Sequence, residues 1–175
     1  MKIKYSSFLL LLLITAFSCD QINNLLTFYV KSNTSITIPS SSPLPFPFEF
    51  LTPNVQTDSS QEFKKNNTNV DLVKDVILDE VKLTITAPEG KTFSFLESIN
   101  IYISTNNDDE VLIASAENIA STASSIKLTT TQAKLDTYIK ASSYKLRTEA
   151  SIRETLSQDV SIRIDLKFKV TADVL

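Results

Sequence analysis

Histidine is absent from the 175-residue chain, and glycine and cysteine each occur only once. Without histidine the chain lacks the usual general base and the commonest metal ligand, so a Ser-His-Asp triad and Cys/His zinc sites are excluded. The single glycine, Gly90, rules out a glycine-rich phosphate loop and a dinucleotide fingerprint. The single cysteine, Cys19, rules out an intrachain disulfide. We therefore expect a protein that is not an enzyme and holds no cofactor or metal.

The overall composition is that of a folded, mildly acidic protein. Hydrophobic residues make up 42% of the chain, which is typical of a globular rather than a disordered sequence. The net charge is −3 and the isoelectric point is near 5.0, which argues against nucleic acid as a partner, because nucleic-acid binding needs concentrated positive charge. The length allows one ordinary domain with a sizeable core.

The N-terminus has the pattern of a secretory signal peptide. Lys2 and Lys4 precede an apolar run from Phe8 to Ile14, and small residues follow it. The uncharged stretch from Tyr5 to Ser18 has 14 residues, which is shorter than the roughly 20 that a membrane-spanning helix needs. We therefore assign residues 1–18 to a signal peptide and exclude them from the fold.

The lone cysteine follows this signal directly, in the sequence Ala16-Phe17-Ser18-Cys19. This stretch resembles the lipobox of bacterial lipoproteins in its small residue at −3 and its serine at −1. It departs from the commonest form in having Phe at −2 and Ala rather than Leu at −3. The resemblance implies cleavage before Cys19, a diacylglycerol on its thiol, and an acyl chain on its amino group. Two or more chains suffice for stable membrane anchoring. The alternative is a plain secretory signal that leaves a free thiol.

Asp20 comes directly after the cysteine and bears on which membrane holds the protein. In some bacteria an aspartate at this position keeps lipoproteins in the inner membrane, and other lineages ignore it. We expect anchoring in the outer membrane, with the periplasmic or surface face undecided and the inner membrane as the alternative.

Residues 19–58 are expected to form a lipidated tether that ends in a proline- and phenylalanine-rich extended segment. Five of the six prolines lie between Pro39 and Pro53, and proline cannot donate to a sheet ladder. Phe46, Phe48 and Phe50 alternate with other residues and so share one side of an extended chain. They predict an edge segment packed on the body or, alternatively, an exposed aromatic strip for a partner.

Residues 59–175 are predicted to form an all-β domain, an antiparallel β-sandwich of immunoglobulin-like or similar type with one or two short helices. Apolar residues alternate with polar ones in several segments separated by turn signals. The final 95 or so residues also resemble small uncharacterised β-sandwich lipoproteins of Gram-negative bacteria, with no motif that implies an activity. The predicted strands lie at 78–86, 99–104, 111–114, 126–130, 144–152 and 160–170.

Helices are predicted at three places in this domain. Ser59 and Glu62 match a capping box, which predicts a helix from Ser59 to about Asn66. Apolar residues at 72, 73, 76 and 77 predict a further helical turn before the sheet. A short helix is expected over 132–139, with Thr131 as its cap.

The last two strands are predicted to pair as a hairpin through residues 153–159. The register that opposes unlike charges places Glu149 opposite Arg163 and Arg147 opposite Asp165, each pair contributing a few tenths of a kcal/mol. The same register makes Leu146 face Leu166 and Tyr144 face Phe168.

Acidic residues supply three candidate sites, each with a structural alternative. One is the segment Asn106–Glu110, which brings together side-chain oxygens of the kind that calcium prefers as ligands. The alternative is a solvent-exposed hairpin turn, because Asn and Asp are also common in turns. Asp79 and Glu80 are adjacent, and neighbours on a strand point to opposite faces, so we expect them not to act as a catalytic pair. Glu154 and Asp159 are further apart in the sequence, and their spacing leaves open whether they act as a catalytic pair. Surface charge is the alternative for both pairs.

Basic residues on the last two strands predict a mostly positive outer face. Its members are Lys145, Arg147, Arg163, Lys167 and Lys169. It would suit anionic lipid headgroups or acidic glycans, and the alternative is a solvated face of mixed charge. We expect a membrane-anchored, non-enzymatic binding, adhesion or structural module whose partner is a protein, glycan or lipid. The second hypothesis is a carrier of lipids or other apolar ligands in a cavity between two sheets.

Overall fold

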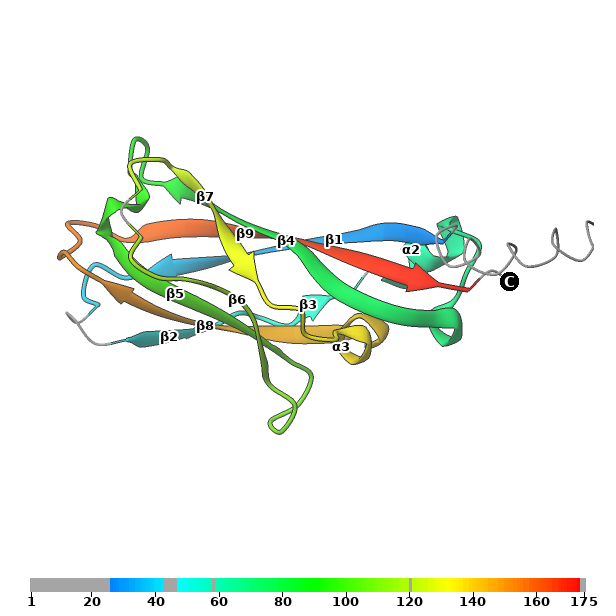
Figure 1. Cartoon of the computed structure of the whole chain (residues 1–175). Helices are drawn as coiled ribbons and strands as arrows, with labels where there is room; N and C mark the ends of the chain where they lie inside the picture. The colour runs from blue at the N-terminus through cyan, green and yellow to red at the C-terminus, as the bar shows by residue number, and fades with distance from the viewer. Residues whose placement is uncertain (1–25, 43–46, 58, 120, 174–175) are drawn as a thin grey trace, which may run out of the picture.

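The chain folds into one antiparallel sheet that curls round its own apolar face (Figure 1). This computed structural model describes residues 26–42, 47–57, 59–119 and 121–173. The strand order is β1-β9-β4-β7-β6-β5-β8-β2, and β3 pairs with β8 beside β2. The strands are β1 (Thr27–Ile38), β2 (Phe48–Leu51), β3 (Val55–Gln56), β4 (Val73–Ala87), β5 (Leu96–Ser104), β6 (Val111–Ala116), β7 (Ser125–Thr130), β8 (Ser143–Ile152) and β9 (Val160–Ala172). The predicted all-β, antiparallel class is confirmed.

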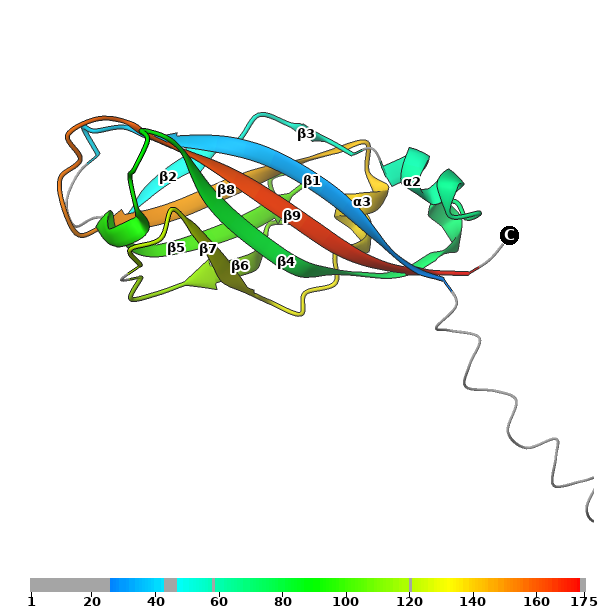
Figure 2. The same cartoon turned by 90° about the horizontal axis from the view of Figure 1, so that it is seen from above.

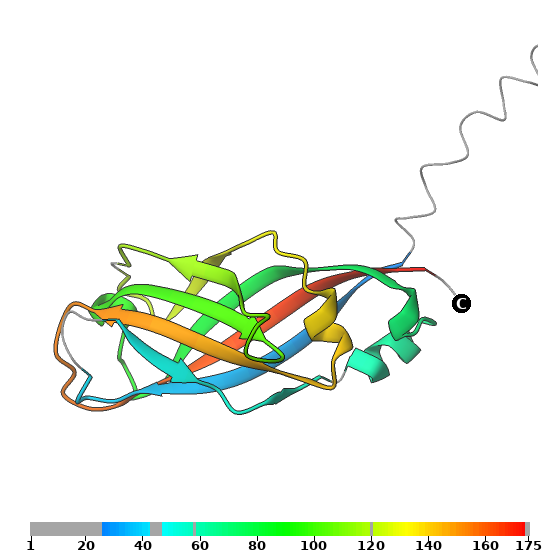
Figure 3. The same ribbon diagram turned by 90° about the horizontal axis from the view of Figure 1, so that it is seen from below.

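The curl places two groups of strands across from each other. Figures 2 and 3 show β1, β9 and β4 along one side and β5, β8 and β2 along the other. Strand β7 joins them, because residues 125–128 pair with β4 and residues 129–130 pair with β6. Among the described residues no ladder joins β1 to β2 or β3, so the ring of strands stays open there. We call this gap between β1 and the segment Pro53–Thr57 the seam.

The inner face is built by simple alternation of apolar and polar residues. In β9 every second side chain from Val160 to Val170 is almost wholly buried, and the intervening ones face outward. Burying each large aliphatic or aromatic side chain contributes about 1.5–3 kcal/mol, as an upper estimate. The predicted strands over residues 144–152 and 160–170 are confirmed by β8 and β9.

The predicted hairpin between these two strands is wrong. Strand β8 pairs with β5 and with β2 and β3, whereas β9 pairs with β1 and β4. Glu149 lies opposite Glu49 and Asn100, and Arg163 lies opposite Ser35 and Thr84. The two strands meet through their apolar faces, and not edge to edge.

The predicted contact between Tyr144 and Phe168 does occur, but it crosses the interior. The two ring centroids lie 6.2 Å apart in an edge-to-face arrangement. Apolar alternation shows that both strands have an inward face. It does not specify whether two such strands pair edge to edge in one sheet or stack face to face across the core. Stacking buries both faces, because the polypeptide between Ile152 and Val160 crosses from one side of the curl to the other (Figure 1).

Strand β1 corrects the expected extent of the tether. Residues 27–38, placed in the tether by sequence, pair along their whole length with β9. Phe28, Val30, Ile36 and Ile38 are buried in the common core. The folded body therefore includes residues 27–38 and is not confined to residues 59–175. The signal peptide, Cys19 and Asp20 lie outside the described residues.

The helices agree with the sequence in part. The helix predicted from Ser59 is confirmed as α2 (Ser59–Lys65). The helical turn expected over residues 72–77 is wrong. A single 3-10 turn, η3 (Val70–Leu72), is capped by the Asn69 side chain, and β4 begins at Val73 because its backbone pairs with β9.

The helix expected over residues 132–139 is shorter and starts later, as α3 (Asp136–Lys140). Its predicted cap, Thr131, instead donates its hydroxyl to the Leu112 carbonyl oxygen at 2.8 Å. That bond ties the end of β7 to β6 and delays the start of the helix.

Candidate functional site

The phenylalanines of the proline-rich segment lie on the edge strand β2. Phe48 and Phe50 are half-buried and pack against the core, with their ring centroids 5.1 Å apart. Phe46 lies outside the described residues. Between and after them, Glu49 and Leu51 point to solvent, and Leu51 is 73% exposed. In the described part of the segment the aromatic side chains are therefore directed at the body.

The structure does not bring the predicted basic residues into one face. Lys145 and Arg147 lie on β8, whereas Arg163, Lys167 and Lys169 lie on β9, on the other side of the curl (Figure 2). The single-face prediction is wrong because it depended on the β8–β9 hairpin. Arg163 and Lys167 line an outer depression of about 370 Å³ whose lining also includes Glu80 and Asp165. Both halves of the expected surface are thus of mixed charge.

Arg147 is held in a compact ionic network on the outer face. Its guanidinium lies 2.7 Å from a Glu110 oxygen and 2.8 Å from a Glu49 oxygen, and it stacks 4.1 Å from the centre of the Tyr102 ring. The hydrogen bond to Glu110 and the charges of Glu110 and Glu49 raise the pKa of Arg147 above its ordinary value. Arg147 also separates Glu49 from Glu149, which are direct cross-strand neighbours. Its role there is to join β8 to β2 and to the turn before β6.

Asp79 and Glu80 contradict the expectation that they point to opposite faces. The pairing of β4 with β9 shifts by one residue between Leu78 and Glu80, which is a β-bulge. The bulge lets both carboxylates reach outer-face lysines, Asp79 to Lys167 at 2.6 Å and Glu80 to Lys127 at 2.5 Å. The hydrogen bond from Lys127 lowers the pKa of Glu80. Each carboxylate therefore has its own lysine partner.

The Asn106–Glu110 cluster forms a self-contained turn. The Asp109 carboxylate accepts hydrogen bonds from the Thr105 amide at 2.9 Å, the Thr105 hydroxyl and the Asn106 amide at 3.1 Å. These bonds lower the pKa of Asp109 against the opposing effect of desolvation. The Asn106 side-chain oxygen accepts from the Asp108 amide. Of the oxygens proposed as calcium ligands, those of Asn106 and Asp109 thus serve the turn itself, and the Glu110 carboxylate binds Arg147.

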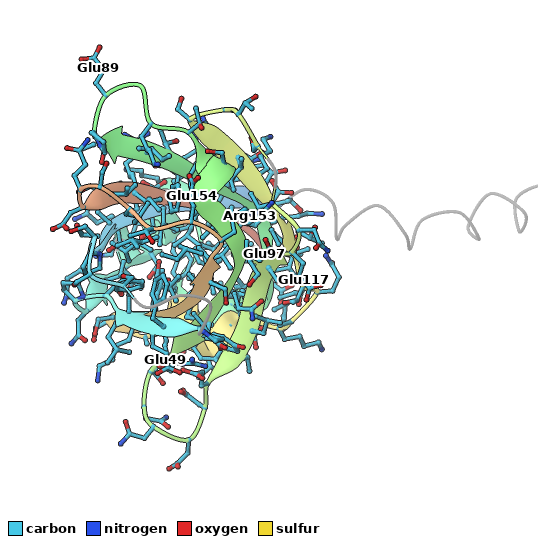
Figure 4. The ribbon with its side chains drawn as sticks, turned by 90° about the vertical axis from the view of Figure 1, so that its left-hand side faces the viewer. Glu49, Glu89, Glu97, Glu117, Arg153 and Glu154 are labelled. Atoms are coloured by element: carbon cyan, nitrogen blue, oxygen red, sulfur yellow. The ribbon has the colours of Figure 1, made fainter. Side chains whose placement is uncertain are left out.

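Acidic side chains also gather at the end of the body opposite the start of β1. Figure 4 shows Glu97, Glu117 and Glu154 near Arg153 on this end, with Glu89 projecting separately from its edge. Arg153 contacts Glu97 at 2.6 Å, and Glu154 lies 3.7 Å from Lys91. Asp159, the other half of the candidate pair with Glu154, accepts a hydrogen bond from the Ser40 amide at 2.8 Å. Glu154 and Asp159 thus have separate structural partners.

A pocket of about 290 Å³ lies at the seam. One wall is the middle of β1, residues 30–34, and the other is the segment Pro53–Thr57 with β3. Ile139, Tyr144 and Phe168 close its floor. The pocket exists because Ser32 and Thr34 occupy inward positions of β1 where large apolar side chains stand before and after them. Small polar residues leave space there and keep it open to water.

Tyr144, at the floor of this pocket, has a buried hydroxyl group. The side chain is 2% exposed, and its hydroxyl makes no hydrogen bond of acceptable geometry among the described residues. Burial raises the pKa of Tyr144 to about 12, against a smaller opposing effect of the neighbouring Ser32 hydroxyl. The phenol therefore stays neutral at physiological pH and keeps its proton available for donation. A buried donor without a partner costs about 1–3 kcal/mol.

Sequence reasoning missed this pocket because it did not predict β1. The available signal was the even-numbered series Phe28, Val30, Ser32, Thr34 and Ile36, in which two small polar residues interrupt an apolar face. Tyr144 was correctly placed on an inward face, but its unpaired hydroxyl depends on strands far apart in sequence. The remaining lining residues, Asn54 and Gln56 among them, follow Pro53 in a segment without periodicity.

No three His, Cys, Asp or Glu side chains in the described part of the chain lie where they could hold a metal ion together. None of the helices described is long and apolar enough to cross a membrane.

Comparison with known proteins identifies no family. No family model matches the chain, and no curated protein matches its sequence. Among solved structures, Desmodium yellow mottle tymovirus aligns with a TM-score of 0.32 and 13% identity, over 85% of this chain and 90% of that chain. Turnip yellow mosaic virus aligns with a TM-score of 0.30 and 11% identity, over 85% of this chain and 95% of that chain. Likenesses this weak carry no argument about function.

Proposed function

We propose that this chain is a lipid-anchored, non-enzymatic binding module of a bacterial cell envelope, and that the seam pocket is its binding site. The observation that carries the binding role is the pocket itself, with a buried and unpartnered Tyr144 hydroxyl at its floor. The anchor is proposed from the lipobox-like sequence that ends at Cys19. We place it in the outer membrane.

The start of the body suits this arrangement. Strand β1 begins at Thr27, eight residues after Cys19, a span of at most about 29 Å when fully extended. The end of the body that carries α2 and the start of β1 would then lie close to the membrane (Figure 1). The opposite end, with its glutamates, would face away (Figure 4). The seam runs along the side and would remain accessible.

In finer detail, we propose to class the curled sheet as a β-sandwich. The support is that β8 and β9 stack through their apolar faces, as the Tyr144–Phe168 contact illustrates. A crystal structure in which the strands close into a continuous hydrogen-bonded ring would contradict this classification.

A carrier of apolar ligands receives less support. Such a carrier needs an apolar cavity, yet the seam pocket has mainly hydroxyl and amide side chains along its walls. The inward side chains beside it, such as Leu146 and Ile164, are fully buried in the core.

The anchor is tested by feeding cells an alkyne-tagged palmitate and comparing the wild-type protein with Cys19→Ala. The proposal expects label and membrane association for the wild type and the loss of both in Cys19→Ala. An unlabelled wild-type protein that is released as a soluble chain would contradict the proposed anchor.

A further inference from the structure

We infer that the seam pocket binds a neutral, polyhydroxylated ligand the size of one sugar residue. This inference rests on the proposed binding role of the pocket and adds the chemistry of the ligand.

The width of the seam excludes an added β-strand as the occupant at this point. Strands in a sheet lie about 4.8 Å apart, so a strand inserted between two others needs them nearly 10 Å apart. Strands β1 and β3 approach within 8 Å between Cα atoms. The pocket volume of about 290 Å³ is at the lower limit of the roughly 300–1,000 Å³ found for drug-sized ligands. The space therefore suits a small molecule or the terminal unit of a larger one.

The polar groups of the pocket match hydroxyl groups better than they match charges. Hydroxyl and amide side chains both donate and accept hydrogen bonds, as a sugar hydroxyl does. The lining includes such groups on both walls, at Ser32, Asn33, Thr34, Asn54, Gln56 and Thr57. Lys31 is its only charged residue. A phosphate or carboxylate would call for more positive charge, and a cationic ligand would call for a carboxylate.

The strand edges add further groups of the same kind. Strand β1 has a neighbour on one side only, β9, and β3 pairs only with β8. Backbone amide and carbonyl groups on their seam sides have no ladder partner among the described strands. Hydroxyl groups of a ligand in the seam would supply both donors and acceptors to them.

The floor supplies a donor and an apolar surface. The Tyr144 hydroxyl is buried beside the Ser32 side chain, so a ligand oxygen that displaces that side chain would give the hydroxyl the acceptor that it lacks in the described structure. Val30, Val55 and Ile139 form the apolar part of the lining, against which the C–H groups of a sugar ring can pack. The pocket is too shallow for a long acyl chain, because Phe168 is completely buried beneath it.

The test is saturation-transfer NMR on the full chain purified from membranes in detergent. The probes are the methyl glycosides of glucose, galactose, mannose and N-acetylglucosamine, with isobutyrate and methyl phosphate as small non-sugar probes whose methyl protons can be observed. We expect at least one glycoside to give a saturable signal and the other two probes to give none. An oligosaccharide ending in the same sugar would bind more tightly if the natural source is a glycan, and equally if it is a free sugar.

Two variants with the same substitution locate the site. Ser32→Leu fills the pocket, whereas Ser35→Leu places the same side chain on the exposed outer face of the same strand. We expect Ser32→Leu to abolish glycoside binding and Ser35→Leu to leave it unchanged. Tyr144→Phe removes one hydrogen bond and is expected to weaken binding about three- to tenfold. Gln56→Ala, at an exposed rim position, replaces Ser32→Leu if that variant does not fold.

The outcomes separate the ligand class from the binding role. Isobutyrate or methyl phosphate signals that Ser32→Leu removes, in the absence of any glycoside signal, would overturn the sugar assignment and keep the pocket as a binding site. Glycoside binding that survives Ser32→Leu would overturn the site. If no probe binds, the sugar inference is wrong, and the palmitate labelling of Cys19 still tests the anchor independently.

Discussion

Removing β1 should prevent the domain from folding. The perturbation is a chain that begins at Ser59, where composition alone places the start of the domain, compared with a chain that begins at residue 26. The shorter chain loses β2 and β3 with their pairing to β8, and it loses the whole ladder between β1 and β9. From β1 alone it loses four buried apolar side chains, Phe28, Val30, Ile36 and Ile38. At about 1.5–3 kcal/mol each, these side chains contribute together about 6–12 kcal/mol as an upper estimate.

That loss is comparable to the whole stability of an ordinary domain, which is about 5–15 kcal/mol. We therefore expect the chain from residue 26 to give a cooperative urea transition and a dispersed NMR spectrum, and the chain from Ser59 to give neither. A milder variant, Ile38→Ala, should cost about 2–5 kcal/mol, because Ile38 is completely buried. Ser35→Ala, at an exposed position of the same strand, should change stability by less than about 0.5 kcal/mol. Cooperative unfolding of the Ser59 chain with unchanged stability would refute the place of β1 in the core.

Three further predictions concern single side chains. Because the pKa of Tyr144 is raised from 10.0 to about 12, the unfolded chain ionises this group first as pH rises. Urea stability should therefore fall by up to about 2.7 kcal/mol between pH 10 and 12 more in the wild type than in Tyr144→Phe, and equal slopes would contradict the burial of the hydroxyl. Arg147→Ala should destabilise the protein by about 1–3 kcal/mol at neutral pH, because it leaves Glu49 opposite Glu149 and removes the stacking on Tyr102. An unchanged urea midpoint would show that the network is dispensable. Asp109→Asn should cost about 1 kcal/mol and raise amide exchange in the adjoining turn, and unaltered exchange would contradict its role.

The sequence predicts where the strands of this fold lie better than it predicts which strands pair with each other. Alternation identifies β8 and β9 and the inward position of Tyr144, because side-chain direction in a strand depends only on residue number. Pairing depends on which apolar faces meet in three dimensions. Favourable opposition of Glu149 with Arg163 is worth a few tenths of a kcal/mol, which is small against the burial of two apolar faces. The hairpin prediction failed for that reason.

The candidate site was harder to predict for a related reason. Ser32 and Thr34 reduce the apolar signal of β1, and the same two residues create the pocket. The small polar residues that form the pocket thus weaken the apolar alternation by which the strand would be recognised in the sequence. The bulge at Asp79 likewise breaks the rule of alternating faces, and only the register with β9 reveals it.

The most direct test of the open seam is the reactivity of single cysteines with a maleimide. Thr34→Cys and Ile36→Cys would each be introduced into the Cys19→Ala chain, so that each variant has one thiol. Thr34 lines the pocket and is half-buried, whereas Ile36, two residues further along the same face, is buried. We expect rapid labelling at position 34 and slow labelling at position 36, limited by unfolding. Equal protection of both thiols would mean that the seam is covered, which would contradict an open pocket there. Equal reactivity would mean that β1 is not part of the core, which would contradict the fold.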